Sequence, residues 1–140
     1  MNFILDTNVI SEFVAPKPNE SLLRWLRAID AEHVFLTVIT VGEIKKGIEK
    51  LPASPRKDAL NHWLNDDLLV RFQGHILEID VETAVLWGDL SARLQALGRP
   101  MGAVDSLLAA IALKWEFTLV TRNTDDFIHS GVKLLNPWNS

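Results

Sequence analysis

The chain has 140 residues, of which 48% are hydrophobic, a formal net charge of −4 and no cysteine. This size predicts one compact domain over residues 1–140 that buries about two-thirds of its unfolded surface. The lack of cysteine excludes disulfides, thiol chemistry and cysteine-based zinc fingers. The longest apolar run, Leu107 to Leu113, is far shorter than the roughly 20 residues that span a bilayer, and the first residues do not resemble a secretion leader. We therefore expect a cytoplasmic protein that does not bind membranes.

The N-terminal stretch predicts a buried strand that runs directly into a helix. Three bulky apolar residues end at Leu5, and residues 7–13 have a helical pattern. Asp6 therefore lies where the strand ends, which is the edge at which open α/β sheets bind ligands. The alternative is that Asp6 only caps the helix, a role that aspartate fills well.

A second strand and helix follow after an amphipathic helix that Asn19 can cap. Residues 34–38 are β-branched and aromatic, which predicts a second buried strand, and a helix is expected over residues 41–50. Thr40 and Glu43 have the spacing of a capping box. Glu43 therefore either folds back on its own helix end or carries a function.

A cluster of basic residues lies on a predicted helical hairpin. Ser54-Pro55 starts the second helix of this hairpin, with proline at the first helical position. The cluster is the densest basic patch in the chain and consists of Lys45, Lys46, Lys50, Arg56 and Lys57. Such a patch is most often a solvated surface, but in an acidic chain it is also a candidate nucleic-acid contact.

Residues 75–79 predict a third strand, after which Asp80 caps a helix that extends to about Leu97. One side of this helix is an apolar stripe made of Leu86, Leu90, Leu94 and Leu97. Another side, which we call the small-residue strip, consists of Ala84, Gly88, Ser91 and Ala92. Small side chains allow close helix packing, so this strip favours contact with a second subunit.

The last third of the chain carries two more candidate acids. Residues 103–113 form a helix that is apolar on nearly every side, with Asp105 in its first turn. The helix dipole favours an acid there, but a buried acid also needs a partner. Residues 117–121 predict a fourth strand, followed by a short helix that Asn123 can cap, with Asp126 three residues on. Residues 132–135 predict an edge strand.

Alternating strands and helices predict an α/β fold, a mostly parallel sheet flanked by helices on both faces. In such a sheet Asp6, Glu43 and Asp126 follow three strands at the same edge, and Asp105 precedes one of them. Two carboxylates about 4 Å apart repel by about 4 kcal/mol at an effective dielectric near 20, so converging acids must take up protons or a cation. An all-oxygen set of this kind favours Mg²⁺ or Mn²⁺.

Other catalytic chemistries find little support in the sequence. The four histidines, His33, His62, His75 and His129, include no close pair at zinc-binding spacing. The chain has no Walker-type or GxGxxG loop for a nucleotide and no G-x-S-x-G turn for a hydrolase serine.

Four short motifs occur in order along the chain. They are Ile4-Leu5-Asp6-Thr7-Asn8, Thr40-Val41-Gly42-Glu43, Gly98-Arg99-Pro100 with Asp105 and Ala109-Ala110, and Thr121-Arg122-Asn123-Thr124-Asp125-Asp126-Phe127. Together they resemble PIN domains, and closely the VapC/FitB-type ribonuclease toxins of bacterial toxin–antitoxin pairs, over essentially the whole chain. The resemblance implies a PIN fold, Mg²⁺-dependent RNA cleavage in which Mn²⁺ can substitute, homodimerisation and inhibition by a small antitoxin.

The resemblance assigns the core acids to Asp6, Glu43 and Asp105. Family members vary at the fourth position, where this chain offers Asn123, Asp125 and Asp126, and we favour Asp126 because the Asp-Phe pair ends the motif. A metal held by these acids, directly or through water, would activate a water for attack on the scissile phosphate, leaving a 5′-phosphate and a 3′-hydroxyl.

Neighbouring polar residues have two interpretations. Hydrogen bonds to metal-bound waters or to a phosphate oxygen are open to Thr7, Asn8, Thr121 and Asn123, although turn and cap roles explain these residues equally well. Arg122 either offsets the acidic site or is an ordinary surface arginine. The basic side chains of Lys45 and Lys46 are further candidate RNA contacts.

Two other functions remain possible on the sequence. A phosphatase with an aspartyl nucleophile also places an acid after its first strand, but it would need a second acid two residues on, where this chain has Asn8. A noncatalytic interaction module, in which the acids merely cap helices, would need no divalent ion.

Overall fold

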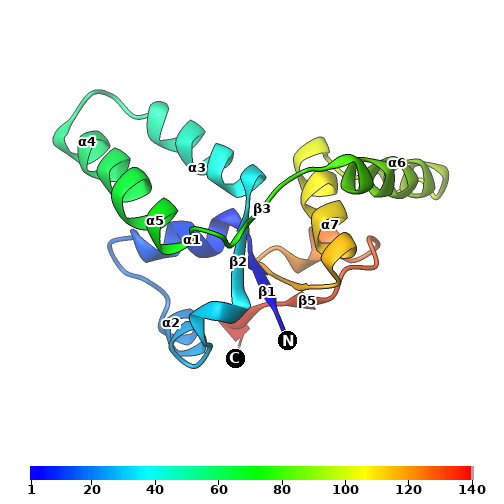
Figure 1. The fold of residues 1–140 in the computed structure, drawn as a ribbon, viewed down its shortest axis with the longest axis horizontal. Helices are drawn as coiled ribbons and strands as arrows, with labels where there is room; N and C mark the ends of the chain where they lie inside the picture. Colours follow the sequence, from blue (N-terminus) through cyan, green and yellow to red (C-terminus); the bar gives the residue numbers. More distant parts are fainter. Residues whose placement is uncertain (140) are drawn as a thin grey trace.

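A five-stranded parallel sheet forms the centre of the protein, with helices on both faces (Figure 1). The computed structural model describes residues 1–139 and orders the strands β3-β2-β1-β4-β5, each parallel to its neighbours. The strands are β1 (Phe3–Leu5), β2 (Val34–Thr37), β3 (Ile76–Leu77), β4 (Thr118–Val120) and β5 (Leu134–Leu135). The predicted α/β fold, with an edge strand at the C-terminal end, is therefore confirmed.

Seven α-helices connect and cover the strands (Figure 1) in the part of the chain that the structure describes. They are α1 (Thr7–Phe13), α2 (Glu20–Arg27), α3 (Val38–Glu49), α4 (Pro55–His62), α5 (Leu69–Arg71), α6 (Val81–Ala96) and α7 (Ala103–Trp115). A π-helical turn (Trp63–Leu68) joins α4 to α5, so the predicted hairpin is α3 followed by one longer helical arm. Short 3₁₀ turns are η1 (Ala31–His33), η3 (Thr124–Phe127) and η4 (Pro137–Asn139).

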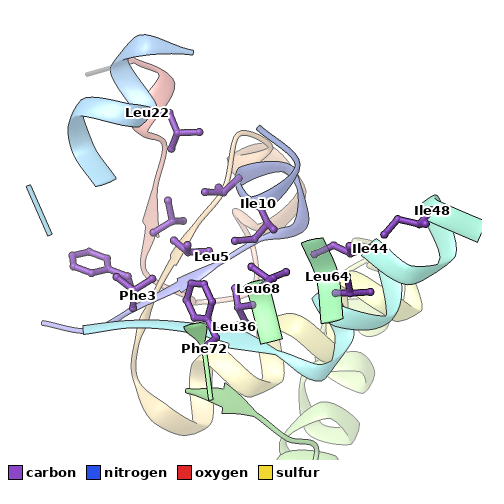
Figure 2. Close-up of a cluster of buried hydrophobic side chains, with 13 residues drawn as sticks. Phe3, Leu5, Ile10, Leu22, Leu36, Ile44, Ile48, Leu64, Leu68 and Phe72 are labelled. Carbon is purple, nitrogen blue, oxygen red and sulfur yellow. The ribbon is translucent and has the colours of Figure 1, made fainter. Parts of the chain in front are cut away.

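Alternate side chains of the strands pack into two separate hydrophobic cores, one on each face of the sheet. In β1, Phe3 and Leu5 point into the core beneath α1 to α5, whereas Ile4 points into the core beneath α6 and α7. Figure 2 shows the first core, in which side chains from α1, α3 and the π-helical turn gather over the sheet. All three β1 residues are buried, as expected for a central strand covered on both faces, so the end of β1 has a fixed position.

The N-caps observed at the helix starts can be compared with those predicted from the sequence. The side chains of Asn19, Ser54 and Asp80 accept backbone N–H groups at the starts of α2, α4 and α6, so these three predicted caps are confirmed. The predicted capping box of Thr40 and Glu43 is wrong. Thr37 caps α3 instead, accepting from the Thr40 N–H at 3.2 Å. The helix starts three residues earlier than predicted because Thr37 itself ends the strand with an extended backbone, which leaves Glu43 in the second turn.

The sides of α6 are only partly as predicted. Leu90 and Leu94 are buried against α7, but Leu97 lies beyond the last turn and is 63% exposed, so the apolar stripe is shorter than predicted. The small-residue strip is exposed at Ala84, Gly88 and Ala92. Its surface is therefore not used for packing within the described part of the protomer. No helix in that part is long and apolar enough to cross a membrane.

Candidate active site at the carboxyl edge of the sheet

Asp6 lies at the end of β1 and is the N-cap of α1, so its predicted capping role is real. One carboxylate oxygen accepts the Thr7 N–H at 2.7 Å. The other accepts the Thr121 hydroxyl at 2.9 Å and the Asn8 amide at 3.4 Å. The side chain is 8% exposed, and no lysine, arginine or histidine in residues 1–139 forms an ion pair with it. Asp6 is thus a buried acid that the protein itself does not neutralise.

The pKa of Asp6 is raised above its ordinary value, chiefly because burial disfavours the charged form. The hydrogen bonds from Thr121 and Thr7 act in the opposite direction, whereas the charges of Glu43 and Asp126 raise the pKa further. Glu43 and Asp126 therefore lie close enough to Asp6 for electrostatic repulsion, which is the predicted convergence of acids from different strand ends.

Glu43 faces the site from the second turn of α3. Its Oε1 accepts the hydroxyl of Thr7 at 2.6 Å, and Thr7 directly follows Asp6. The same hydroxyl lies 3.4 Å from that of Thr40, one helical turn before Glu43. Thr7 thus orients Glu43 towards the turn that carries Asp6, which is a positioning role that the sequence did not reveal.

Asp105 occupies the first turn of α7, which lies across the sheet centre from α3 (Figure 1). It is half-buried, and its pKa is raised first by burial and then by the charges of Asp6, Asp126 and Glu43. Its carboxylate makes no hydrogen bond or ion pair with any residue from 1 to 139, and α7 has no side-chain cap. Helix capping therefore does not explain this acid.

The fourth position lies on η3, where Asp125 and Asp126 are both exposed. The charge of Asp126 raises the pKa values of Asp6 and Asp105, and Asp125 is not among the charges that do so. The predicted cap at Asn123 is wrong: its side chain does not cap η3, because its backbone turns away from the extended conformation and its N–H donates to Thr121 Oγ1 at 3.1 Å. The electrostatic effect on Asp6 and Asp105 thus favours Asp126 over Asp125 as the fourth acid.

A hydrogen-bonded junction joins the first turn of α1 to the loop after β4. The buried Thr121 hydroxyl donates to Asp6 and accepts from the Asn8 amide at 3.1 Å. The side-chain oxygen Oδ1 of Asn8 accepts the backbone N–H of Arg122 at 3.2 Å. The side chains of Asn8 and Thr121 therefore hold the Asp6 carboxylate in place.

The basic candidates form no ion pair with any of the four acids among residues 1–139. The Arg122 guanidinium is 5.7 Å from the ring centre of Trp138 and forms no ion pair in the described part of the chain. Lys45 donates to Asn61 at 2.8 Å and lies 3.5 Å from Glu49, whereas Lys46 is exposed. The structure thus gives Arg122 a stacking contact, and it leaves Lys46 as the candidate without an intramolecular partner among residues 1–139.

The four acids are spread over a wider area than a tight metal cage. No three of them bring carboxylate oxygens within 4.8 Å of one another; within residues 1–139 that spacing occurs only for Asp30, Glu32 and His33. Those three precede β2 at the opposite edge of the sheet, and the two acids are exposed. The donor set at the carboxyl edge is all oxygen and loosely spaced, which fits a hard cation such as Mg²⁺ that keeps several of its waters.

Two cavities adjoin the acids. One, of about 370 Å³, lies between α1, α3 and α4 and includes Thr7 and Glu43 in its lining. The other, of about 350 Å³, lies between the α6–α7 turn and η3. Asp105 and Asp126 line this second cavity together with Arg99 and His129, to which the sequence assigned no role in the site. The larger cavity of about 430 Å³ under α2 contains none of the four acids.

The PIN domain model matches residues 3–132, and the chain belongs to the PIN domain family. The resemblance drawn from the four motifs is therefore confirmed. The matched range includes all four acids and the four strands β1 to β4, and it ends just before β5.

Named relatives match the chain over nearly its full length. "Toxin FitB" of Neisseria gonorrhoeae is 35% identical over 136 residues, covering 97% of this chain and 98% of that protein. "VapC ribonuclease Y4jK" of Sinorhizobium fredii is 33% identical over 135 residues, covering 96% of each chain. The crystal structure of FitAcB from Neisseria gonorrhoeae superposes with a TM-score of 0.94 at 35% identity, covering 99% of both chains. The chain thus resembles ribonuclease toxins in both sequence and fold.

Proposed function

We propose that this protein is a Mg²⁺-dependent endoribonuclease, in which Mn²⁺ can substitute, and that it is the toxin of a bacterial toxin–antitoxin pair. Its family and its relatives, one named a toxin and another a VapC ribonuclease, support the ribonuclease and toxin assignments. The observation that carries the metal assignment is the set of four acids at one edge of the sheet, where burial and mutual repulsion raise the pKa values of Asp6 and Asp105.

Each residue of the site has a distinct role in this proposal. Asp6 and Asp105 would hold the metal directly, and Glu43 and Asp126 directly or through water. Such an ion neutralises charge at the scissile phosphate and supplies an activated water, so that cleavage leaves a 5′-phosphate and a 3′-hydroxyl. The Thr7 hydroxyl keeps Glu43 oriented. One Asp6 oxygen is held by Thr121 and Asn8, and the other by the Thr7 N–H.

The rival functions explain fewer of these contacts. A purely capping role fits Asp6, but Glu43 is in the second turn of its helix and Asp105 makes no capping bond. A phosphatase would need an acid at position 8, where the Asn8 amide is already bonded to Thr121. A shared cation, in contrast, explains why acids from four separate segments lie at one edge of the sheet.

Cleavage assays test the proposal directly. The purified protein, freed of any partner, is expected to cut single-stranded or loop RNA with Mg²⁺ or Mn²⁺ and to stop when chelator is added. Asp105→Asn is expected to lower the rate more than about 100-fold, beyond the 10–100-fold typical of residues that only orient a metal ligand. Asp30→Asn removes an exposed acid at the opposite edge and serves as the control. An Asp105→Asn variant as active as this control would overturn the assignment, and release of phosphate from small phosphoesters without RNA cleavage would favour the phosphatase.

In the cell we expect a cytoplasmic homodimer that a small antitoxin neutralises. The exposed small-residue strip of α6 supports the dimer, because a second helix can approach closely where side chains are small. A side chain at Gly88 would meet no atom within 4 Å in the protomer. Gly88→Arg is therefore expected to give a folded monomer by light scattering, whereas Gly47→Arg, equally unobstructed on α3, stays dimeric. Dimers in both variants would reject this surface as the interface.

A further inference from the structure

The cavity between the α6–α7 turn and η3 combines two acids of the proposed metal site with a basic side chain. Asp105 and Asp126 line it together with a third acid, Asp125, and with Arg99 and His129. Arg99 is the one lysine or arginine in its lining within residues 1–139. Its volume of about 350 Å³ lies at the lower end of the roughly 300–1,000 Å³ typical of ligand sites. It therefore has room for a single nucleotide, but not for a folded RNA stem.

The backbone of Arg99 is held rigidly although its side chain is exposed. Gly98 ends α6 in the left-handed conformation, with φ of 69°, which favours glycine. This turn lets the Arg99 N–H donate to the Leu94 carbonyl at 2.8 Å, and Pro100 fixes the next residue. The side chain of Arg99 thus leaves the backbone at a defined point on the cavity rim.

The guanidinium of Arg99 is not used inside the protein. It forms no hydrogen bond or ion pair with any residue that the structure describes, although acids line the same cavity. Two other basic side chains already have partners, since Lys45 pairs with Glu49 and Arg122 stacks on Trp138. Lys46 is also unpaired among residues 1–139, but it does not line this cavity. Arg99 is therefore available to an anion that enters the cavity.

The facing wall of the cavity is also held in place. Arg93 of α6 donates to the His129 carbonyl at 3.3 Å and to the Ser130 carbonyl at 3.2 Å. The Ser130 hydroxyl donates back to the Phe127 carbonyl at 2.6 Å. These bonds fix the segment that carries His129 while leaving its ring unbonded to other described residues.

We propose that Arg99 is the phosphate-binding residue of a subsite for the nucleotide next to the scissile phosphate, with His129 forming the facing wall. This inference rests on the proposed ribonuclease function. A strand of RNA must bring its charge to an acidic edge of an acidic protein, and a planar guanidinium can bind one phosphate through two parallel hydrogen bonds. Arg99 would thus hold the strand while the acids act on the adjacent bond.

Steady-state kinetics on a short single-stranded RNA test the subsite. Arg99→Ala is expected to raise KM about tenfold or more, the range for a charged hydrogen bond, with kcat nearly unchanged because such a contact forms equally in substrate and transition state. Arg99→Lys keeps the charge but cannot make the two parallel hydrogen bonds of a guanidinium, so a KM between those of the parent and Arg99→Ala is expected. The matched control, Arg27→Ala, removes the same charge from the last turn of α2, beside the cavity at the other edge of the sheet.

Binding without turnover gives a second readout. In an Asp6→Asn background that does not cleave, fluorescence anisotropy is measured with the same RNA over a range of salt concentrations. Adding Arg99→Ala is expected to weaken binding and to reduce the slope of log affinity against log salt by about 0.7, the value for one phosphate contact on a single strand. An unchanged affinity and slope, with KM equal to that of the Arg27→Ala control, would overturn the subsite. If the parent protein cuts no RNA with any divalent ion, the ribonuclease proposal fails as well, so the two failures are distinguishable.

Discussion

The starts of α1 and α6 use the same residue type for the same local purpose, with opposite electrostatic results. Asp6 caps α1 and Asp80 caps α6, and each accepts a backbone N–H. The pKa of Asp80 is held well below its usual range, first by its hydrogen bond with Lys114 and then by those from Thr83. The pKa of Asp6 is raised by burial and by neighbouring acids.

This contrast shows that capping and function are separate properties of an aspartate. Asp80 has what a structural cap needs, namely a half-exposed carboxylate with a lysine partner from the neighbouring helix. Asp6 has a cap bond but lacks the counter-charge in the described chain, and it lies among acids instead of bases. The missing positive charge supports our proposal that a cation binds at the end of β1.

The largest expected difference between the two aspartates is in catalysis. Asp6→Asn keeps a capping oxygen but loses a metal ligand, and we expect kcat/KM for RNA to fall more than about 100-fold. Asp80→Asn is expected to leave kcat/KM within about twofold, because surface changes away from a site rarely affect it. Both rates are measured with the same RNA at saturating Mg²⁺. Equal losses in the two variants would show that the charge of Asp6 is no more important for catalysis than the charge of the structural cap Asp80.

The response to metal should separate the two regions next. Mg²⁺ at 100 times its dissociation constant stabilises a protein that binds it by about 2.7 kcal/mol through mass action. We expect Mg²⁺ to raise the melting temperatures of the parent and of Asp80→Asn by the amount that corresponds to this stabilisation. The melting temperature of Asp105→Asn should rise much less. Differential scanning fluorimetry with and without chelator measures all three. No response in the parent would mean that the acids do not share a cation.

The smallest effect is the dependence of stability on pH in chelator. The raised pKa of Asp105 means that its contribution to stability is present below the ordinary value of 3.8 and is lost as the pH rises through the folded-state value. We therefore expect Asp105→Asn to melt higher than the parent, by an amount that grows from about pH 4 to pH 7.

Asp80→Asn should behave in the opposite way. Because the pKa of Asp80 is lowered, its stabilisation is present above 3.8 and is lost only as the pH falls through the folded-state value. The variant should melt lower than the parent by a constant amount from about pH 4 to pH 7. Thermal melts at unit steps of pH measure both variants, and parallel curves for the two would remove the distinction between the aspartates.

Much of this organisation was predictable from the sequence because the signals are local. The apolar run before Asp6 and the apolar helix after Asp105 predict a strand end and a buried helix start, and both are observed. Asn19, Ser54 and Asp80 were identified as caps because a cap bond joins residues only three positions apart.

The remaining features depend on contacts between distant residues. The Thr7–Glu43 bond spans 36 positions, and without it the spacing of Thr40 and Glu43 suggested a capping box that does not form. Thr121 bonds Asp6 across 115 positions. Arg99 and His129 share a cavity only because the α6–α7 turn meets η3 in the folded chain. Hydrophobic periodicity and motif spacing do not predict such contacts between residues that are distant in the sequence.

The two hydrogen bonds from Arg93 have a mechanical consequence. They tie the carbonyls of His129 and Ser130 to the side of α6, so one long side chain acts as a tether between a loop and a helix that are otherwise separate in sequence. Neither hydrogen bond of Arg93 reaches any of the four acids. Replacing Arg93 with a shorter side chain is therefore expected to loosen the wall of the cavity that carries His129 without removing any hydrogen bond of the four acids. Residue 93 would thus affect how tightly the cavity binds an RNA strand independently of the acids.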